Sequence, residues 1–394
     1  MSHDTRNARP PEEAREFIVF GSDWNRHPST SQHLARGLLP DSQVIWVETV
    51  GLRAPSLTWR DIKRCGQKLL DFCTTRRETT TPDHPHLHVL SPPTLPFTRL
   101  RAVRRFNLWS VKNKVRRAAR ALGFEKPVLV LTCPHQGDYV GHMQESCSIY
   151  LCLDDYSLWH GMDAVHVTRM EQDILGKVDA IVTVSARLAE RLGGPGRRVQ
   201  VISQGVDVHH FSSRTRAKSG GPFEIVYFGM IDARLDQDLL LRVAHSLPDA
   251  RIRLIGPQVA DTRRLAAAAN IHVEAGVSYD LLPESIASAD VFILPFLVNP
   301  LTESCTPLKL KEYLATGKPV VSTPNPTASE WGRFVQIASS HDEFIQRLES
   351  IAAHGEAGHA PQLQESLERE TWAAKTTEFL ALVNKVRSSR LSMS

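Results

Sequence analysis

Residues 307–323 read PLKLKEYLATGKPVVST. The first part of this stretch carries apolar side chains at helical spacing, and Gly317 is the kind of residue that most often ends a helix. The run after the second proline is apolar and β-branched, which is typical of a strand buried on both faces of a parallel sheet. The stretch therefore predicts a helix over 307–316, a stop at Gly317 and a strand over 319–323.

This alternation of helix and strand repeats along the whole chain. In the first half, short β-branched runs predict strands at residues 16–20, 43–48, 87–90, 128–132, 149–153, 180–184 and 199–203. In the second half, they predict strands at residues 224–228, 252–256, 271–275, 291–296, 319–323 and 334–338. Helical patterns separate the runs, as they do in parallel α/β sheets. We therefore expect two tandem Rossmann-like, doubly wound α/β domains that face a central cleft.

Length and local composition place the domain boundary. A chain of 394 residues is too long for one ordinary core. Residues 209–222 are polar, basic and rich in Gly and Pro, as linkers are. We therefore expect an N-terminal domain over 1–208 and a C-terminal domain over 223–368, with a final helix within 369–394 that packs back on the first domain.

The composition is that of a globular protein. No segment is apolar over the ~18 residues that a membrane span needs. The polar N-terminus lacks the apolar core of a secretory signal, so we expect a loose leader and a cytoplasmic protein. The six cysteines lack the spacing of a zinc site, and we expect reduced thiols.

The helix over 307–316 contains a single carboxylate. Leu308, Glu312 and Ala315 share one face of this helix, and Lys311 is expected to point away from it. Glu312 then lies at the edge of the packed side, where a carboxylate needs hydrogen-bond partners. The paired hydroxyl groups of a ribose would supply them, and an ion pair with a lysine three residues earlier is the alternative.

These residues resemble a known family, the GT-B glycosyltransferases, and within it the glycogen-synthase-like branch found in bacterial envelope and exopolysaccharide pathways. The family carries the segment P-x-K-x-x-E-Y-x-A-x-G-x-P-V-V, which is matched here by Pro307, Lys309, Glu312, Tyr313, Ala315, Gly317, Pro319, Val320 and Val321. Residues 179–192 and 199–211 resemble two further segments of the family, and the final helix resembles one that crosses back onto the first domain. The resemblance covers most of the chain.

The resemblance implies that Glu312 holds the ribose of a nucleoside diphosphate sugar. The Arg and Lys of the family's diphosphate loop are missing, because GMIDARLDQD stands at 229–238. The diphosphate contacts that we expect instead are Gly229, Arg234 and Lys309. The other expected donor-binding residues are Pro307, Leu308, Ser304 and Val277.

One alternative reading and one departure from the family pattern concern this donor site. A surface salt bridge from Arg234 to Asp232 or Asp236 would explain the arginine without a ligand. Many members of the branch also carry a second glutamate where Ser304 stands, with Glu303 one residue away. The diphosphate contacts are therefore less well specified by the sequence than the ribose contact.

Candidate acceptor residues follow strands of the first domain. Asp154 and Asp155 come directly after one strand and His135 after another. By the resemblance, a residue here orients or deprotonates the acceptor hydroxyl, and we favour Asp155 over Asp154 as the one that faces the cleft. Adjacent carboxylates on an extended chain point to opposite sides, so we expect no metal site.

Gly21 and His33 mark a further candidate acceptor site after the first strand. The corner holds one glycine and a Ser-Thr-Ser helix start, and it fits neither G-x-G-x-x-G nor the P-loop. An ordinary Ser/Thr helix cap is the alternative.

Residues 98–124 hold nine Lys or Arg and no acid. Apolar side chains recur there at steps of mostly three or four residues, at Leu100, Val103, Phe106, Val111, Val115, Ala118 and Leu122. We expect an amphipathic basic helix or helix pair, with Trp109, that suits the surface of an anionic membrane. A solvated charged face is the alternative, and no recognition module points to nucleic acid.

The sequence thus predicts a metal-independent glycosyltransferase without a cofactor. Its donor is a nucleoside diphosphate sugar, a UDP-sugar in preference to a GDP-sugar, and its acceptor is a polysaccharide or a polyprenyl-linked saccharide. The expected location is the cytoplasm, with peripheral contact to the inner face of the membrane. A nucleotide-sugar 2-epimerase and a non-catalytic sugar-nucleotide-binding subunit of an assembly complex remain alternatives.

Overall fold

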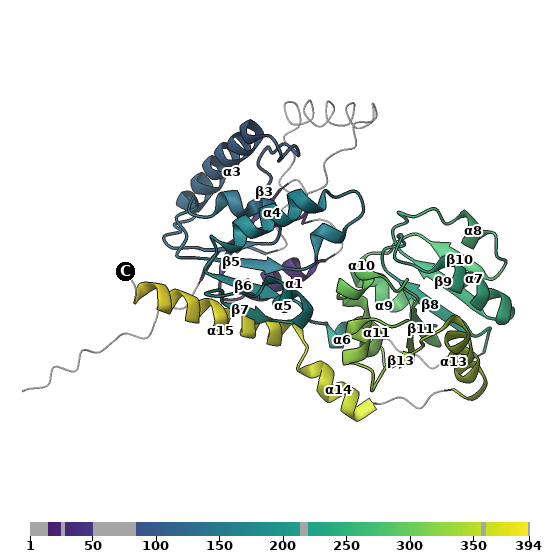
Figure 1. Cartoon of the computed structure of the whole chain (residues 1–394). Coiled ribbons are helices and arrows are strands. Elements are labelled where there is room, and N and C mark those ends of the chain that lie inside the picture. Colours follow the sequence, from purple (N-terminus) through teal and green to yellow (C-terminus); the bar gives the residue numbers. More distant parts are fainter. Residues whose placement is uncertain (1–14, 25–27, 50–83, 213–219, 356–359, 393–394) are drawn as a thin grey trace, which may run out of the picture. The chain divides into compact units, whose positions relative to one another are not determined.

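The computed structural model describes residues 15–24, 28–49, 84–212, 220–355 and 360–392. The chain forms two compact units, shown in Figure 1. The first unit comprises Met1–Ile202 together with Thr376–Ser394, and the second comprises Ser203–Lys375.

The first unit is built on a seven-stranded sheet with the strand order β3-β2-β1-β4-β5-β6-β7. Its strands are β1 (Glu16–Gly21), β2 (Gln43–Glu48), β3 (Leu87–Leu90), β4 (Val128–Leu131), β5 (Cys147–Cys152), β6 (Ala180–Thr183) and β7 (Val199–Val201). All neighbouring pairs are parallel. Each strand predicted from the β-branched runs is present, which confirms the parallel α/β class.

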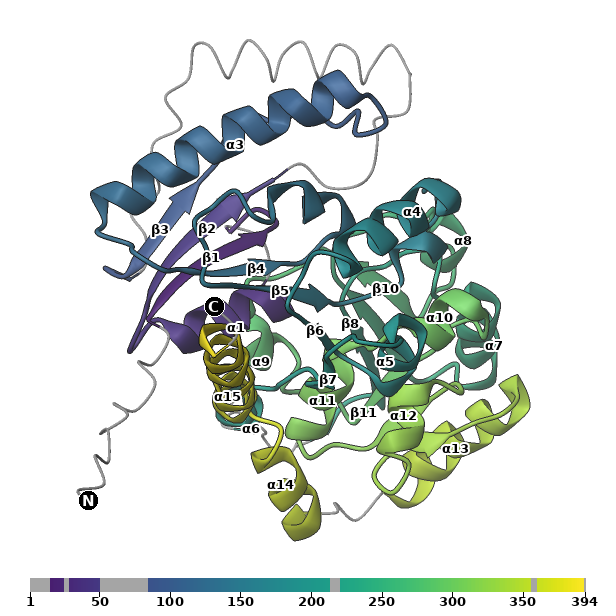
Figure 2. The same ribbon diagram turned by 60° about the vertical axis from the view of Figure 1, so that its left-hand side comes forward.

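Helices connect these strands and cover the sheet. They are α1 (Thr30–Leu38), α3 (Arg101–Ala121), η1 (Pro134–Tyr139), η2 (Tyr156–Leu158), α4 (Ala164–Leu175), α5 (Ala186–Leu192) and α15 (Trp372–Leu391), of which the residues from Thr376 onward belong to this unit. Figure 2 shows α3 running along the part of the sheet that holds β2 and β3. Apolar side chains of β1, β2, β4, β5 and β6 form one fully buried core with those of α3 and α4.

The second unit repeats the architecture with six parallel strands in the order β10-β9-β8-β11-β12-β13. They are β8 (Glu224–Phe228), β9 (Arg251–Ile255), β10 (Ile271–Glu274), β11 (Val291–Leu294), β12 (Val320–Ser322) and β13 (Gln336–Ile337). Its helices are α6 (Val208–Ser212), α7 (Gln237–Ser246), α8 (Arg263–Ala266), η3 (Tyr279–Leu281), α9 (Leu282–Ser285), α10 (Pro300–Ser304), α11 (Leu308–Ala315), α12 (Pro326–Glu330), α13 (His341–His354) and α14 (Ala360–Glu368).

The strand order fixes where a ligand can bind. In the second unit the order reverses between β8 and β11, and open α/β sheets bind ligands at such a switch point, beyond the carboxyl ends of the strands. The corners that follow these two strands are joined there, because Leu297 N–H donates to the carbonyl of Arg234 at 2.8 Å. Leu235 and Phe296 also form an isolated β-bridge.

Residues 307–323 fold as predicted. Helix α11 begins after Pro307, and Gly317 follows it with a φ of 73°, a left-handed conformation that favours glycine. Strand β12 comes next and pairs with β11. The helix therefore delivers its side chains to the same edge of the sheet as the two joined corners.

The segments around the expected domain boundary contain structure that the sequence did not predict. Helix α6 occupies the start of the expected linker over 209–222, and residues 213–219 of that linker lie outside the described part of the chain. Helix α14 stands before the final helix, in a segment for which the sequence predicted no helix. At the end of α15, Arg390 Nη1 donates to the carbonyl of Ser146 and to Asp179 Oδ2, at 3.1 and 3.0 Å, within the first unit.

Candidate functional site

The corner after β8 is shaped by the contact between Gly229 and Lys309. Gly229 has a φ of 128°, and a Cβ at this position would lie 2.2 Å from Lys309 Nζ. Only a glycine lets the lysine pack directly on the backbone here. Two residues that are 80 positions apart in the sequence, and that were both expected at the diphosphate, are thereby in contact.

The Lys309 ammonium is enclosed by aromatic rings. Its Nζ donates to the Tyr227 hydroxyl at 2.5 Å and lies 4.2 Å from the centroid of that ring. The Phe296 ring centroid is 5.5 Å away. Burial, and to a lesser extent the charge of Arg234, lowers the pKa of Lys309 to about 7. A ligand with negative charge would favour the charged form.

Arg234 is fixed beside this lysine by Asp232. Arg234 Nε donates to both carboxylate oxygens, at 3.0 and 3.1 Å, and Nη2 donates to Oδ2 at 2.7 Å. Burial opposes the charge of the guanidinium, but the hydrogen bonds and the charge of Asp232 outweigh it and raise the pKa of Arg234. The salt bridge that the sequence offered as an alternative is therefore present. Asp236, its second possible partner, instead caps α7 by accepting from Leu239 N–H.

Glu312 is a buried carboxylate without a hydrogen-bond partner among the residues that the structure describes. Its exposed fraction is 8%, and burial raises its pKa to about 7, against the smaller opposite effect of the Lys309 charge. The alternative of an ion pair with Lys309 is not realised, because that ammonium bonds Tyr227 instead. A carboxylate in this position requires hydroxyl or amide donors from elsewhere.

The remaining expected donor residues differ in their positions. Pro307 is the N-cap of α11, and Leu308 begins that helix and is half-buried. The Ser304 hydroxyl donates to the carbonyl of Leu301 at 2.8 Å, within α10. Val277 packs against the core of the second unit. The structure brings Gly229, Arg234, Lys309 and Glu312 together, and we call these four residues the donor cluster.

The burial of Lys311 was not predicted by the helical pattern. Its exposed fraction is 4%, and its Nζ pairs with Glu370 and donates to the carbonyl of Gln204 and to Ser203 Oγ. Lys375 binds the same glutamate at 2.8 Å. Helical periodicity points Lys311 away from the face of Glu312, and chain segments from both ends of the second unit cover it there.

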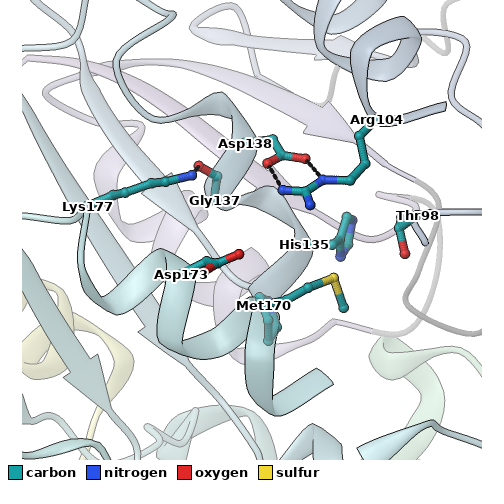
Figure 3. Close-up of a pocket in the computed structure, with 9 residues that line it drawn as sticks. Thr98, Arg104, His135, Gly137, Asp138, Met170, Asp173 and Lys177 are labelled. Atoms are coloured by element: carbon teal, nitrogen blue, oxygen red, sulfur yellow. Dashed lines mark hydrogen bonds and ion pairs between the residues drawn. The ribbon is translucent and has the colours of Figure 1, made fainter. Parts of the chain in front are cut away.

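In the first unit, His135 lies on η1, directly after β4. Figure 3 shows it beside Met170 and Thr98, with Arg104 and Asp138 above. The cavity that these residues line has a volume of about 10 Å³, close to the room that one water needs. Burial lowers the pKa of His135 to about 4, so the ring is neutral at neutral pH. Among the described residues, its Nδ1 has no hydrogen-bond partner.

The walls of this cavity are held by charges. Arg104, on α3, forks onto Asp138, with Nε donating to Oδ2 at 2.7 Å and Nη2 to Oδ1. Lys177 Nζ donates to the carbonyl of Gly137 at 3.1 Å. One of the basic residues that suggested a membrane surface therefore has a structural role.

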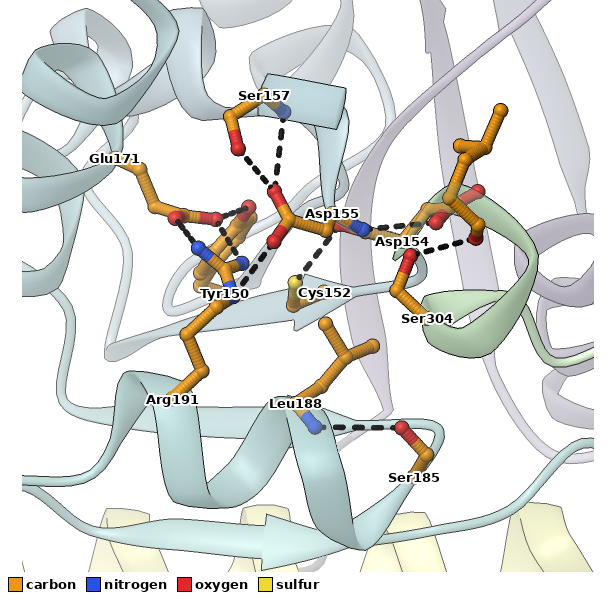
Figure 4. Close-up of polar contacts among 11 residues, drawn as sticks. Tyr150, Cys152, Asp154, Asp155, Ser157, Glu171, Ser185, Leu188, Arg191 and Ser304 are labelled. Carbon is orange, nitrogen blue, oxygen red and sulfur yellow. Dashed lines mark hydrogen bonds and ion pairs between the residues drawn. The ribbon is translucent and has the colours of Figure 1, made fainter. Parts of the chain in front are cut away.

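The two adjacent aspartates have different environments, as Figure 4 shows. Asp155 Oδ1 accepts from the N–H and the hydroxyl of Ser157, at 3.1 and 2.5 Å, and Oδ2 lies 3.3 Å from Arg191 Nε. Arg191 also forks onto the buried Glu171. Asp154 Oδ1 accepts from the Asp155 N–H at 2.8 Å. Both oxygens of Asp155 are thus engaged in holding the turn after β5.

Gly21 and His33 are explained by local packing. A Cβ on Gly21 would lie 2.0 Å from the Trp46 ring, which requires glycine there. Ser29 is the N-cap of α1, and its N–H donates to Gln32 Oε1 at 2.7 Å. His33 lies half-buried on this helix. These contacts match the helix-cap alternative and give no separate sign of a ligand.

Helix α3 is a single helix with an exposed aromatic and basic face. Val111, Val115 and Ala119 are buried, whereas Phe106 and Trp109 have exposed fractions of 39% and 63%. Phe106, one of the apolar positions of the predicted amphipathic pattern, is exposed, whereas the polar residues Asn107 and Ser110 are buried. Arg101, Arg105, Arg117 and Arg120 are exposed with the two aromatic rings.

Sequence reasoning missed three residues of the donor cluster's surroundings. Tyr227 and Phe296 were read only as strand residues, and Asp232 only as a possible partner of Arg234. The D-x-R spacing was the available signal, because an aspartate two residues before an arginine can accept from both its backbone N–H and its side chain.

Within the described ranges, no group of three His, Cys, Asp or Glu side chains is placed to hold a metal ion.

Comparison with known proteins identifies the second unit. Residues 222–354 match the family model described as "Glycosyl transferases group 1". This unit is a group 1 glycosyltransferase domain. The chain is also 25% identical over 199 residues to a putative teichuronic acid biosynthesis glycosyltransferase, TuaH, of Bacillus subtilis strain 168. That match covers 46% of this chain and only 50% of the relative.

Solved structures of glycosyltransferases share the fold of the chain. Sucrose-phosphate synthase from Thermosynechococcus elongatus matches with a TM-score of 0.70 at 12% identity, covering 95% of this chain and all of that one. Anabaena HepE in complex with UDP-glucose matches with a TM-score of 0.59 at 12% identity, over 96% of this chain and 100% of HepE. WaaG, a lipopolysaccharide glycosyltransferase, gives 0.55 at 13% identity, over 93% and 95% of the two chains. The group 1 domain thus forms one half of a GT-B fold, as the sequence predicted.

Proposed function

We propose that the chain is a metal-independent glycosyltransferase that moves a hexose from a nucleoside diphosphate sugar to a saccharide acceptor. The observation that carries this proposal is the donor cluster. In it, a buried carboxylate that has no hydrogen-bond partner among the described residues lies on the same helix as a half-buried lysine. Glu312 would accept hydrogen bonds from the ribose hydroxyls. Lys309 and Arg234 would bind the diphosphate at the corner that Gly229 opens.

The cluster also suggests how the reaction is accelerated. Negative charge develops on the diphosphate as the bond between the sugar and its oxygen breaks. Lys309 and Arg234 are held in place before the reaction, so they need little reorganisation to stabilise this charge. The free N–H groups at the start of α11, after Pro307, would add a favourable partial charge.

We assign the acceptor to the first unit. The cavity beside His135 has room for about one oxygen atom, so it admits a single hydroxyl group rather than a sugar ring. The neutral imidazole would accept a hydrogen bond from that hydroxyl and orient it. Asp154 is the second candidate, and the contacts of Asp155 support a positioning role for that residue in the turn after β5.

The nature of donor and acceptor is proposed from the relatives. HepE binds UDP-glucose, so we propose a UDP-sugar as the donor in preference to a GDP-sugar. TuaH belongs to teichuronic acid biosynthesis and WaaG to lipopolysaccharide biosynthesis, so we propose an envelope polysaccharide or a lipid-linked saccharide as the acceptor. The comparisons support neither a 2-epimerase nor a non-catalytic subunit.

We further propose that the enzyme works at the cytoplasmic face of a membrane. The exposed rings of Phe106 and Trp109 lie among arginines on α3, and such a face suits an anionic lipid surface. No helix within the described residues is long and apolar enough to span a bilayer. Contact would therefore be peripheral, through this face.

A panel of nucleotides tests the donor assignment. UDP, GDP, ADP and dTDP and their sugars are added to the full chain, and unfolding is followed by thermal shift. A ligand at a hundredfold excess over its Kd adds about 2.7 kcal/mol to the free energy of unfolding. Glu312→Ala should lower the affinity of the preferred nucleotide about tenfold, because one charge-assisted pair of hydrogen bonds is lost. Unchanged affinity of this variant, with its fold intact, contradicts the ribose assignment.

A further inference from the structure

The salt bridge of Arg234 has a geometry that selects one edge of the guanidinium. Asp232 binds the edge formed by Nε and Nη2, and it also accepts the backbone N–H of Arg234 at 3.0 Å. Among the residues that the structure describes, the other terminal nitrogen, Nη1, has one hydrogen-bond partner, the Cys305 sulfur at 3.9 Å. Since a thiol is a weak acceptor, the Nη1 edge of Arg234 keeps its capacity for a stronger one.

The arginine is immobilised by more than this pair. Its Cζ lies 5.6 Å from the centroid of the Phe296 ring, and its carbonyl accepts from Leu297 N–H at 2.8 Å. The exposed fractions of the Arg234 and Asp232 side chains are 25% and 18%. Backbone, ring and carboxylate therefore hold the guanidinium in one orientation in the donor cluster.

A second copy of the same turn shows which part of this arrangement is local. Arg263 Nε donates to both oxygens of Asp261 at 3.0 Å, and its backbone N–H donates to Oδ1 at 3.1 Å. That pair is exposed on the surface, with exposed side-chain fractions of 91% for Arg263 and 60% for Asp261, and it lies outside the donor cluster. The turn thus forms from the D-x-R spacing alone, and only at residues 232–234 is it built into the donor cluster.

We propose that Asp232 is a positioning residue that aims the Nη1 edge of Arg234 at the leaving diphosphate. This inference rests on the proposed function. The carboxylate also subtracts one positive charge from the cluster, so it weakens the attraction of a free diphosphate while it fixes the donor geometry. Asp232 therefore lowers the affinity for the diphosphate in the ground state. It stabilises the transition state, because the charge on the leaving diphosphate develops in a fixed direction.

The test separates affinity from turnover. Asp232→Asn keeps the shape and the acceptor for the Arg234 backbone N–H, but its amide cannot grip the Nε–Nη2 edge. We expect kcat for donor hydrolysis and transfer to fall at least about tenfold, while pyrophosphate and donor bind as tightly as before or more tightly. Arg234→Ala should lower both kcat and the affinity for pyrophosphate and donor. Asp261→Asn, the matched control at the exposed turn, should change neither, and Asp232→Glu should recover part of kcat.

An NMR measurement tests the positioning without turnover. In protein with ¹⁵N-labelled arginine, we expect a slowly exchanging Arg234 Nε–H signal that is lost in Asp232→Asn and kept in Asp261→Asn. Pyrophosphate should shift the Arg234 signal in the wild type. Two results with an active wild-type enzyme would overturn this inference and leave the proposed function intact. In one, Asp232→Asn behaves like Asp261→Asn; in the other, Asp232→Asn loses donor affinity and kcat by the same factor. A wild type that binds pyrophosphate through Arg234 but neither binds nor turns over any nucleotide sugar contradicts the proposed function instead.

Discussion

Lys309 and Glu312 lie on the same helix with pKa values that are shifted toward each other. Burial lowers the pKa of Lys309 to about 7 and raises that of Glu312 to about 7. For the lysine, the cost to folding stability is complete below pH 7 and disappears as the pH approaches 10.5. For the glutamate, the cost appears as the pH rises from 4.5 to 7. Both residues give up stability, which is typical of groups that await a ligand.

The lysine makes donor binding depend on pH. Lys309 faces Arg234, Asp232, Glu312 and Cys305, and a bound diphosphate would add negative charge that raises its pKa. Binding should therefore take up a proton above pH 7. The affinity for a UDP-sugar, whose diphosphate does not itself titrate there, should fall by up to about tenfold per pH unit above 7.

Calorimetry in buffers of different ionisation enthalpy measures that proton. In Lys309→Arg, which stays charged over the whole range, the fall in affinity above pH 7 and the proton uptake there should vanish. Equal affinity of the wild type at pH 7 and at pH values well above 7 would show that Lys309 does not contact the diphosphate.

At the level of residues, the sequence predicted the donor cluster but not its supports. Glu312 and Lys309 are found from the local segment, because one helix carries both. The burial of Lys311 was not predicted, because its partner Glu370 is 59 residues away in the sequence. A helical pattern records only which face of a helix is apolar, and a buried ion pair on the opposite face leaves no such record.

At the level of elements, α11 is fixed on two sides. Its donor side presents Lys309 and Glu312, and its opposite side is tied through Lys311 and Glu370 to the segments near 203–206 and 370–375. Gly205 belongs to the same contact, since a Cβ there would lie 2.6 Å from the Trp372 ring. The ion pair should therefore be needed for the stability of the second unit.

Lys311→Ala should lower the free energy of unfolding by about 2–3 kcal/mol, because it leaves Glu370 partly buried with only Lys375 and Ser203. Denaturant unfolding of the full chain measures this change. Arg369→Ala removes an exposed ion pair to Glu365 at a neighbouring position and should cost less than about 1 kcal/mol. Equal costs of the two substitutions would mean that the buried pair contributes no more than a surface one.

The exposed face of helix α3 can be tested for binding to lipid. If its outer face binds anionic lipid, co-sedimentation with vesicles should rise with the share of phosphatidylglycerol and fall with salt, because salt screens exposed charge. Replacing Arg101, Arg105, Arg117 and Arg120 with Gln should abolish most of it. Arg104 is left in place because it holds Asp138.

A matched variant controls for total charge. It replaces Arg251, Arg263, Arg264 and Arg369, four exposed arginines of the second unit, with Gln. This variant should sediment like the wild type, and Trp109→Ser should weaken the part of binding that resists salt. If both quadruple variants lose binding alike, net charge rather than the face of α3 is responsible.

At the level of the whole molecule, the sequence predicted the two sheets almost completely. Buried parallel strands are short apolar runs, and such runs can be recognised in the sequence without knowledge of any distant residue. The segments between them were predicted less well. Helix α6 stands in the expected linker, and the role of Asp155 depends on Arg191, which lies on another helix. Such contacts join residues that are distant in the sequence, so they cannot be predicted from a local sequence pattern.

The proposed division of labour between the units predicts two classes of variant. Arg234→Ala and Lys309→Ala in the second unit should slow the hydrolysis of donor by water as well as transfer, because both reactions break the bond to the same diphosphate. His135→Ala and Asp154→Asn in the first unit should reduce transfer by about tenfold or more and leave donor hydrolysis and nucleotide affinity near the wild type. Single-turnover measurements with and without acceptor separate the two classes.

Asp155→Asn and Ser157→Ala show whether the turn after β5 acts only as a support. They should lower transfer and the free energy of unfolding together, because Asp155 is engaged by Ser157 and Arg191. Loss of transfer in Asp155→Asn with unchanged stability would instead return the acceptor role to Asp155. If neither aspartate nor His135 alters transfer, the acceptor does not bind at these strand ends, and the corner of Gly21 and His33 becomes the next site to test, since it too lies at the carboxyl edge of the first sheet.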